Sequence, residues 1–163
     1  MSTESKEHVL SRLDTAWPAF MALVDAVPED EYDTPGITDQ WCLRELLGHV
    51  IFWADKAAHD IRFAAKGRTD DIALPGGQVN VDKWNADAAA KGKAMTVPEL
   101  RAAVTRAHES ARKAVAESPE AALAVELSGW TVGVRFAEDT YRHYEEHAKE
   151  IKAWVRQLET SEA

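Results

Sequence analysis

The sequence is poor in cysteine, in long apolar runs and in positive charge, and each shortage excludes a class of protein. Cys42 is the single cysteine among 163 residues, which excludes an internal disulfide and a cysteine-based zinc site. No apolar stretch approaches the length that a membrane span requires. Lysine and arginine number 19 against 28 aspartate and glutamate residues, and the net charge of −9 argues against a nucleic acid or an anionic membrane as partner.

The remaining composition is that of an ordinary globular domain. Apolar residues make up 45% of the chain and charged residues 29%, without internal repeats or low-complexity tracts. A chain of this length can bury a substantial hydrophobic core, so we expect one domain over residues 1–163. The N-terminal segment is polar and acidic and has no signal-peptide core, which predicts a cytoplasmic protein.

Helical periodicity dominates the chain, and no segment alternates convincingly at the period of two that is typical of strands. Apolar residues recur at spacings of three and four over residues 4–27, where Pro18 should kink or split the helix. A second helix should begin at Thr38 or Asp39, both good N-cap types, and end just before Gly67. Its centre is apolar on nearly every side, which predicts burial among other helices.

The second half of the chain predicts a loop followed by three helices. Residues 67–79 hold charges, proline and glycine and should form a loop that borders a pocket. A short helix is expected over about residues 81–91, and a capping box at Thr96 opens another that ends near Glu117. The last helix, over about residues 134–158, carries an apolar seam at alternating spacings of four and three. The predicted fold is an all-α four-helix bundle.

Three histidines form a candidate metal site. His143 and His147 are four residues apart, so both imidazoles leave the same face of the last helix about one turn apart. His49 lies in the apolar centre of the second helix and supplies a third ligand from a separate element. Three neutral imidazoles suit zinc or nickel and leave room for water or a substrate atom. Glu150 is close enough along the helix to orient one imidazole.

A plainer interpretation remains open for these residues. Two histidines four apart occur on many helices without a metal, and a histidine in an apolar helix is more often a hydrogen-bonded core residue. His8, His59 and His108 have no partner at ligand spacing and are interpreted as surface or structural residues.

The six tryptophans divide into two groups. Trp17 and Trp154 fit apolar helix faces and are assigned to the core. The other four are candidates for a pocket wall, although packing in the core or at an interface is the simpler assignment; they are Trp41, Trp53, Trp84 and Trp130. The pocket residues singled out beside the histidines are Trp53, Trp84, Asn85 and Glu150.

Two motifs carry a resemblance to a known family. Residues 41–50 read W-C-L-R-E-L-L-G-H-V and look like the W-x-x-x-x-L-L-x-H-L stretch of the second helix in the DinB/YfiT-like superfamily of four-helix-bundle metalloenzymes. Residues 143–147 read H-Y-E-E-H, are followed by Ile151 and Trp154, and look like the H-x-x-x-H of its last helix. The separation of His49 and His143 along the chain also suits this superfamily, and the resemblance spans nearly the whole chain.

The resemblance implies a divalent metal, zinc or nickel, held by His49, His143 and His147. It also implies a homodimer built on helix faces. Members with known activity include transferases and isomerases that use mycothiol, bacillithiol or glutathione, in which the metal activates the thiol of the cofactor. The related mycothiol-dependent maleylpyruvate isomerases usually carry a second, C-terminal domain.

Three functional hypotheses follow. The first is a cytoplasmic metalloenzyme, a thiol S-transferase or hydrolase, that activates a thiol or water to attack a small electrophilic substrate. The second is a metal-independent protein that binds a small molecule or protects against a toxin, because a toxin-opening branch of the superfamily resembles the region of Lys83, Trp84 and Asn85. The third is a non-catalytic helical module selected for its dimer face.

Overall fold

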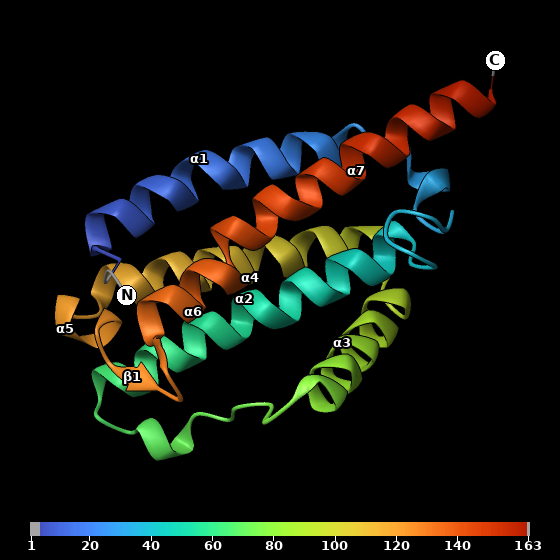
Figure 1. Cartoon of the computed structure of the whole chain (residues 1–163). Helices are drawn as coiled ribbons and strands as arrows, with labels where there is room; N and C mark the ends of the chain where they lie inside the picture. The colour runs from blue at the N-terminus through green and yellow to red at the C-terminus, as the bar shows by residue number, and fades with distance from the viewer. Residues whose placement is uncertain (1–3, 163) are drawn as a thin grey trace.

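Four long helices form a bundle in the computed structural model, which describes residues 4–162 (Figure 1). They are α1 (Lys6–Asp25), α2 (Leu43–Ala65), α4 (Val97–Glu117) and α7 (Tyr141–Ser161). Helix α2 packs against α4, and α1 packs against α7. The predicted all-α four-helix bundle is confirmed. No helix in the described part of the chain is both long enough and apolar enough to cross a membrane.

Shorter elements surround the bundle. They are the 3₁₀ helices η1 (Glu29–Glu31) and η2 (Thr69–Asp71), the helices α3 (Gln78–Lys93), α5 (Glu120–Leu123) and α6 (Val132–Asp139), and the strands β1 (Glu126–Leu127) and β2 (Trp130–Thr131). The two strands form an antiparallel hairpin, and its turn residues Ser128 and Gly129 have φ values of 51° and 81°. The sequence pattern predicted no strand, and the left-handed Ser-Gly turn is the signal that it overlooked.

The core is built from the apolar faces of all four long helices. Leu13 and Phe20 of α1, Leu46 and Ile61 of α2, Leu100 and Val115 of α4, and Tyr144 and Ile151 of α7 are among its buried members. Full burial of one such side chain contributes roughly 2 kcal/mol, so these faces account for the association of the helices. Pro18 lies inside α1, which continues through it as one helix; the predicted split does not occur.

Helix α2 begins later than predicted. Cys42 is its N-cap residue, and the Cys42 backbone N–H donates to Oε1 of Glu45 at 3.2 Å. Thr38 instead forms an isolated β-bridge with Trp41, whose N–H donates to the Thr38 carbonyl at 2.9 Å. Asp39 adopts a φ of 49°, which no helix start tolerates. The prediction of Thr38 or Asp39 as N-cap is therefore wrong, and these residues form a tight turn before the helix.

The last predicted helix is broken in two. Helix α6 ends at Asp139 and α7 begins at Tyr141, because Thr140 leaves helical geometry with φ of −124° and ψ of −101°. The Thr140 hydroxyl donates to the Phe136 carbonyl at 2.6 Å, a local side-chain bond that competes with the helical ladder. The prediction of one continuous helix over residues 134–158 is wrong. The break directly precedes the two histidines of α7.

Helix α3 crosses α2 at unusually close range. A Cβ atom on Gly48 would lie 2.4 Å from the Ala88 carbonyl oxygen, and one on Gly92 would lie 2.3 Å from the Arg44 carbonyl oxygen. Only glycine permits this approach at both positions. The contact brings α3 next to the residue that follows Gly48 in the chain, His49. Helix α3 is also longer than the short helix predicted over residues 81–91.

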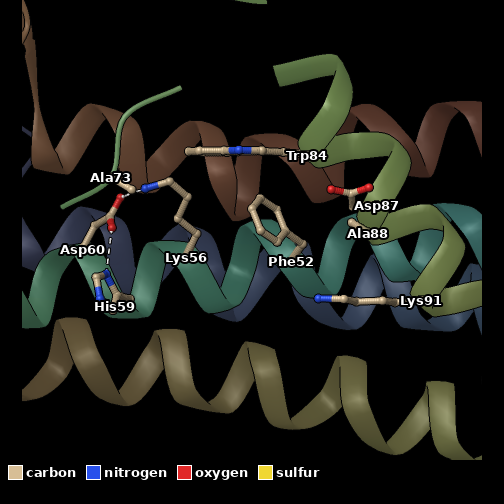
Figure 2. A pocket seen from close by; sticks show the side chains of 9 residues that line it. All are labelled: Phe52, Lys56, His59, Asp60, Ala73, Trp84, Asp87, Ala88 and Lys91. Atoms are coloured by element: carbon tan, nitrogen blue, oxygen red, sulfur yellow. Dashed lines mark hydrogen bonds and ion pairs between the residues drawn. The ribbon is translucent and has the colours of Figure 1, made fainter. Parts of the chain in front are cut away.

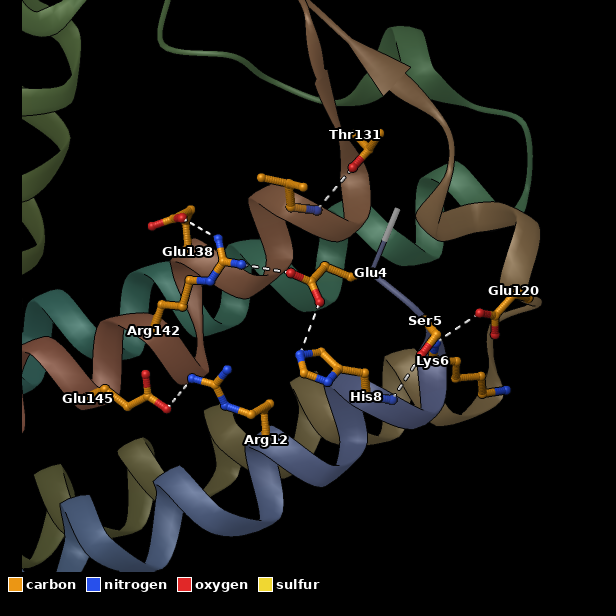
Figure 3. A network of polar contacts seen from close by, with 11 residues as sticks. Glu4, Ser5, Lys6, His8, Arg12, Glu120, Thr131, Glu138, Arg142 and Glu145 are labelled. Atoms are coloured by element: carbon orange, nitrogen blue, oxygen red, sulfur yellow. Dashed lines mark hydrogen bonds and ion pairs between the residues drawn. The ribbon is translucent and has the colours of Figure 1, made fainter. Parts of the chain in front are cut away.

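Ion pairs hold the start of the chain against α7 (Figure 3). Arg142 donates to Glu4 at 2.7 Å, and Arg12 of α1 donates to Glu145 at 2.5 Å. The backbone N–H of Lys6 donates to Glu120 at 3.0 Å. Exposed pairs of this kind contribute only about 0.5 kcal/mol each, so their main effect is to fix the position of the first turn of α7.

Candidate metal centre

Three histidines converge between α2 and α7. Nε2 of His49 lies 2.7 Å from Nε2 of His143, across a separation of 94 residues in the chain. The His143 and His147 rings are 4.4 Å apart between centroids, and the His49 and His147 rings are 5.1 Å apart. Each residue offers one nitrogen, and these three atoms all lie within 4.8 Å of one another. The structure therefore brings together the three residues that the sequence singled out.

The histidines are largely shielded from solvent, and for His49 and His143 this burial favours the neutral form. His49 and His147 are 7% and 8% exposed. Burial, with a smaller effect from the neighbouring His147, lowers the pKa of His49 to about 4, and the Asn85 side chain and Glu150 partly oppose this shift. Burial also lowers the pKa of His143 well below its usual value, with added effects from His147 and His49. Neutral imidazoles are the protonation state that binds a metal.

Unsatisfied ring nitrogens test whether this cluster fits a metal ion. Nε2 of His147 is buried and has no hydrogen-bond partner among the described residues, while its Nδ1 lies 2.5 Å from Oε2 of Glu150. Glu150 accepts a hydrogen bond from Nδ1–H of His147, and in this tautomer the lone pair of Nε2 is free to bind a metal. The Nε2 atoms of His49 and His143 face each other, and two nitrogen lone pairs this close repel unless a proton or another cation lies between them. An all-nitrogen donor set of this kind fits a borderline divalent cation.

Two tryptophans enclose the cluster on the side of α2. The Trp41 ring is 5.1 Å from the His49 ring, and the Trp53 ring is 6.5 Å from it. Nε1 of Trp53 donates to Oδ1 of Asn85 at 2.8 Å, so a residue of α3 fixes the orientation of this indole. Trp53, Asn85 and Glu150 thus lie in contact with the histidines or one side chain away from them.

A cavity of about 350 Å³ adjoins these enclosing residues. Trp41 and Asn85, which flank His49, form part of its lining, together with the turn at residues 38–40 and Asp82. The turn that replaced the predicted start of α2 therefore forms one wall of an approach to the histidines.

Trp84 lines a different cavity, which also has a volume of about 350 Å³ (Figure 2). Figure 2 shows its indole extending from α3 above Lys56 and Phe52 of α2. Nζ of Lys56 lies 2.6 Å from Oδ2 of Asp60 in the same wall. Trp84 does not touch the histidines; its centroid is 6.1 Å from that of Trp53, which lies between. The tryptophan and Asn85 predicted together as pocket residues therefore border different cavities.

The remaining histidines and tryptophans divide as follows. His108 is buried in the core, where its ring stacks on Trp17 at 4.1 Å and its Nδ1 lies 3.1 Å from the Tyr144 hydroxyl. This is the structural role predicted for it. Trp130, for which core or interface packing was the simpler assignment, is 46% exposed at the hairpin, and core packing is wrong for it.

Several charged residues near the cluster were not singled out as site residues. Arg135 and Asp139 of α6 share a cavity with Lys56 and Asp60 of α2. The pair on α2 had a weak signal, since two opposite charges stand at helical spacing in an apolar helix. The pair on α6 has the same spacing of four, but only the broken helix and the hairpin bring it to this position.

Comparison with known proteins gives a family match over most of the chain. The profile described as mycothiol maleylpyruvate isomerase N-terminal domain matches residues 13–151. No significant match appears among curated proteins.

Solved structures share the fold at low sequence identity. An uncharacterised protein from Escherichia coli UTI89 superposes with a TM-score of 0.81 at 14% identity over 95% of each chain. The sibling lethal factor precursor DfsB superposes at 0.79 with 12% identity over 96% of this chain and 98% of its own. The colibactin self-resistance protein ClbS, in a complex with a dsDNA, superposes at 0.72 with 16% identity over 91% and 94%. At these identities the likeness shows the fold alone.

Proposed function

Since this chain belongs to the mycothiol maleylpyruvate isomerase N-terminal domain family, we propose that it is a divalent-metal-dependent enzyme acting on a small electrophilic substrate. The ligands are His49, His143 and His147, and the metal is zinc or nickel. The reaction is of the thiol S-transferase or hydrolase type. The observation that carries this proposal is the convergence of three imidazoles, two buried and one half-buried, each of which has a buried ring nitrogen without a hydrogen-bond partner.

A bound divalent ion would act as a Lewis acid that lowers the pKa of a thiol or water and so makes it nucleophilic near neutral pH. The protein's own residues prepare this site. The hydrogen bond from His147 Nδ1 to Glu150 favours the tautomer in which Nε2 can bind the metal. Trp41 and Trp53 exclude bulk water from the rings, which strengthens electrostatic interactions among them.

The proposed cofactor and partners follow from the family and from the charge of the chain. The thiol is a low-molecular-weight compound such as mycothiol or bacillithiol. We propose a small-molecule substrate, one domain over residues 1–163, a homodimer and a cytoplasmic location. ClbS is described in a complex with dsDNA; a net charge of −9 leads us to propose neither nucleic acid nor a membrane as partner here.

Elemental analysis of protein purified without a polyhistidine tag tests the metal site. We expect close to one zinc or nickel ion per chain, and we expect His147→Ala to lose it while circular dichroism shows an unchanged helical content. His59→Ala is the matched control, because the His59 side chain is 47% exposed and lies outside the cluster. Metal-free protein from metal-replete cells, or equal metal content in both variants, would contradict the proposal.

A metal-independent role in small-molecule binding or toxin protection is the alternative. Two observations favour it: the aromatic cavity of Figure 2, and the structural likeness to a protein described as a self-resistance protein. If this alternative holds, substitution of Trp84 or Asn85 removes binding or activity while histidine substitutions leave it intact. The non-catalytic module, the third hypothesis, predicts no ligand-dependent rise in melting temperature across a screen of metabolites and metals.

A further inference from the structure

A cavity of about 240 Å³ beside the histidine cluster holds charged groups that the proposed metal chemistry does not use. We call it the Arg135 cavity and define it by its inner polar residues, Lys56, Asp60, Arg135 and Asp139. Trp53 lies in the wall of this cavity, and the same indole also lies beside His49 in the histidine cluster. The volume is below that of typical drug-sized sites, which limits an occupant to a small metabolite.

Two of the four defining residues neutralise each other. Nζ of Lys56 lies 2.6 Å from Oδ2 of Asp60, and the two side chains are 11% and 8% exposed. Figure 2 shows this pair from the adjoining cavity. Glu138, which also borders the Arg135 cavity, is paired with Arg142 at 2.6 Å. These residues therefore leave no unmatched charge for a ligand.

The other two residues, Arg135 and Asp139, remain unmatched. They stand four apart on α6, yet no ion pair joins them in the described part of the chain. Nη2 of Arg135 donates to the Leu127 carbonyl at 2.9 Å, and its Nε is buried without a partner. The Asp139 carboxyl has no hydrogen bond or ion pair with any residue between 4 and 162. Burial raises the pKa of Asp139 to about 8; Lys56 and, more weakly, Arg135 oppose this effect, while Asp60 and Glu138 reinforce it.

Arg135 and Asp139 therefore present a guanidinium and a carboxyl group to the same small cavity, and neither is held in an ion pair within the described part of the chain. The raised pKa leaves most of this carboxyl protonated at neutral pH, and a cationic group beside it would favour the ionised form. Buried charges are costly unless a partner compensates them, and charge-assisted hydrogen bonds are the strong ones. A simple anion would pair with Arg135 but would be repelled by an ionised Asp139. A simple cation would pair with Asp139 but would be repelled by Arg135. A molecule with both charges satisfies both residues.

The rest of the lining is apolar. Trp53, Leu74, Val81 and Trp130 surround the charged side, and Trp130 from the hairpin stands at the solvent edge. Such walls favour a ligand with a short apolar body.

We propose that the Arg135 cavity binds a small zwitterion, a molecule that carries an ammonium and a carboxylate group beside a short apolar body, as free α-amino acids do. The ammonium group is paired with Asp139 and the carboxylate with Arg135. This site acts independently of the proposed metal centre.

Calorimetric titration with L-alanine, L-leucine and L-phenylalanine tests the proposal, because these probes share both charges and differ in the apolar body. At about pH 8.5 free amino acids keep most of their ammonium form, and most of Asp139, with its pKa of about 8, is ionised. We expect at least one to bind, and we expect its N-acetyl derivative and the amine that lacks its carboxylate, each of which lacks one charge at this pH, to bind at least tenfold more weakly. Absence of binding by all three, or equal affinity of the singly charged analogues, would overturn the proposal.

Variants assign the site within the molecule. Asp139→Asn and Arg135→Gln should each weaken binding at least tenfold, whereas Glu117→Gln on α4 should leave it unchanged because that side chain is exposed and lies outside the cavity. Unchanged affinity in Asp139→Asn would exclude this cavity. The analogue series uses the unaltered protein, so it decides the question even where a variant fails to fold.

Amino acids also bind free metal ions, so the same titration is repeated with His147→Ala. Persistent binding in that variant supports the cavity, and its loss places the amino acid on the metal and refutes the proposal. The metal content of the unaltered protein is measured separately, so failure of the zwitterion site and failure of the metal site are distinguishable.

Discussion

At the scale of single residues, Glu150 sets the form of His147 that a metal requires. Its Oε2 lies 2.5 Å from Nδ1 of His147, and its side chain is 30% exposed. Glu150→Gln keeps the shape but replaces the charged acceptor with a neutral amide. We expect zinc affinity, measured by competition with a chromophoric chelator, to fall about 10-fold to 100-fold.

Glu146→Gln is the control for this measurement. Glu146 is on the same helix, directly before His147, but it is exposed and makes no contact with the cluster. Equal affinities in the two variants would show that Glu150 has no positioning role.

His108 gives the protein a pH-dependent stability that is separate from the metal centre. Burial lowers its pKa from 6.5 to about 4, while Asp14 opposes this effect and Arg112 adds to it. Between these two values the unfolded chain binds more protons than the folded one, so the free energy of unfolding decreases as pH falls through this range. The full contribution, present above the higher value, is on the order of 3 kcal/mol.

Urea denaturation at several pH values between the two limits measures this slope. His108→Asn keeps a nitrogen near the Tyr144 hydroxyl but cannot titrate. The free energy of unfolding of this variant should therefore change less steeply with pH than that of the unaltered protein. His49 and His143 titrate in the same direction in both proteins, so the difference between the proteins isolates His108. Parallel slopes would contradict the assignment.

At the scale of elements, the contact between α2 and α3 depends on two facing glycines. Alanine at Gly48 would place a methyl group against the Ala88 carbonyl, which belongs to the backbone and cannot turn aside. Although alanine favours a helix by about 1 kcal/mol over glycine, we expect Gly48→Ala to destabilise the protein by about 2 kcal/mol, because overpacking outweighs propensity.

The midpoint of urea unfolding, followed by tryptophan fluorescence, checks this expectation. Gly77→Ala is the control, since nothing lies within 4 Å of a Cβ atom at that position and its φ of 163° suits any residue. A midpoint for Gly48→Ala equal to or above that of the control would refute the close crossing.

At the scale of the whole molecule, a metal that bridges α2 and α7 should stabilise the folded state. An ion at about 100 times its dissociation constant adds about 2.7 kcal/mol, which corresponds to a rise of roughly 8 °C in Tm for a protein of this size. Zinc or nickel should produce this shift in a thermal melt, and His49→Ala should abolish it. Magnesium should have no effect, because it prefers oxygen ligands. Equal shifts with magnesium and zinc would argue against the histidine site.

The sequence by itself determined the helices, the bundle and the identity of the three histidines. Periodicities of three and four are local consequences of helical geometry, so they can be read without the fold. The spacing of His143 and His147 and the apolar surroundings of His49 are of the same local kind.

Only the tertiary structure decided what lies around those histidines. The Gly48–Gly92 crossing joins segments distant in the chain. The break at Thr140 and the hairpin are local features, but only the fold decides which residues lie beside them. Together these features bring Asn85 to Trp53, and they bring Arg135 and Asp139 to Lys56, at positions where no sequence spacing relates the partners. A charge is unmatched only with respect to its neighbours in space, so the Arg135 cavity was not visible in the sequence.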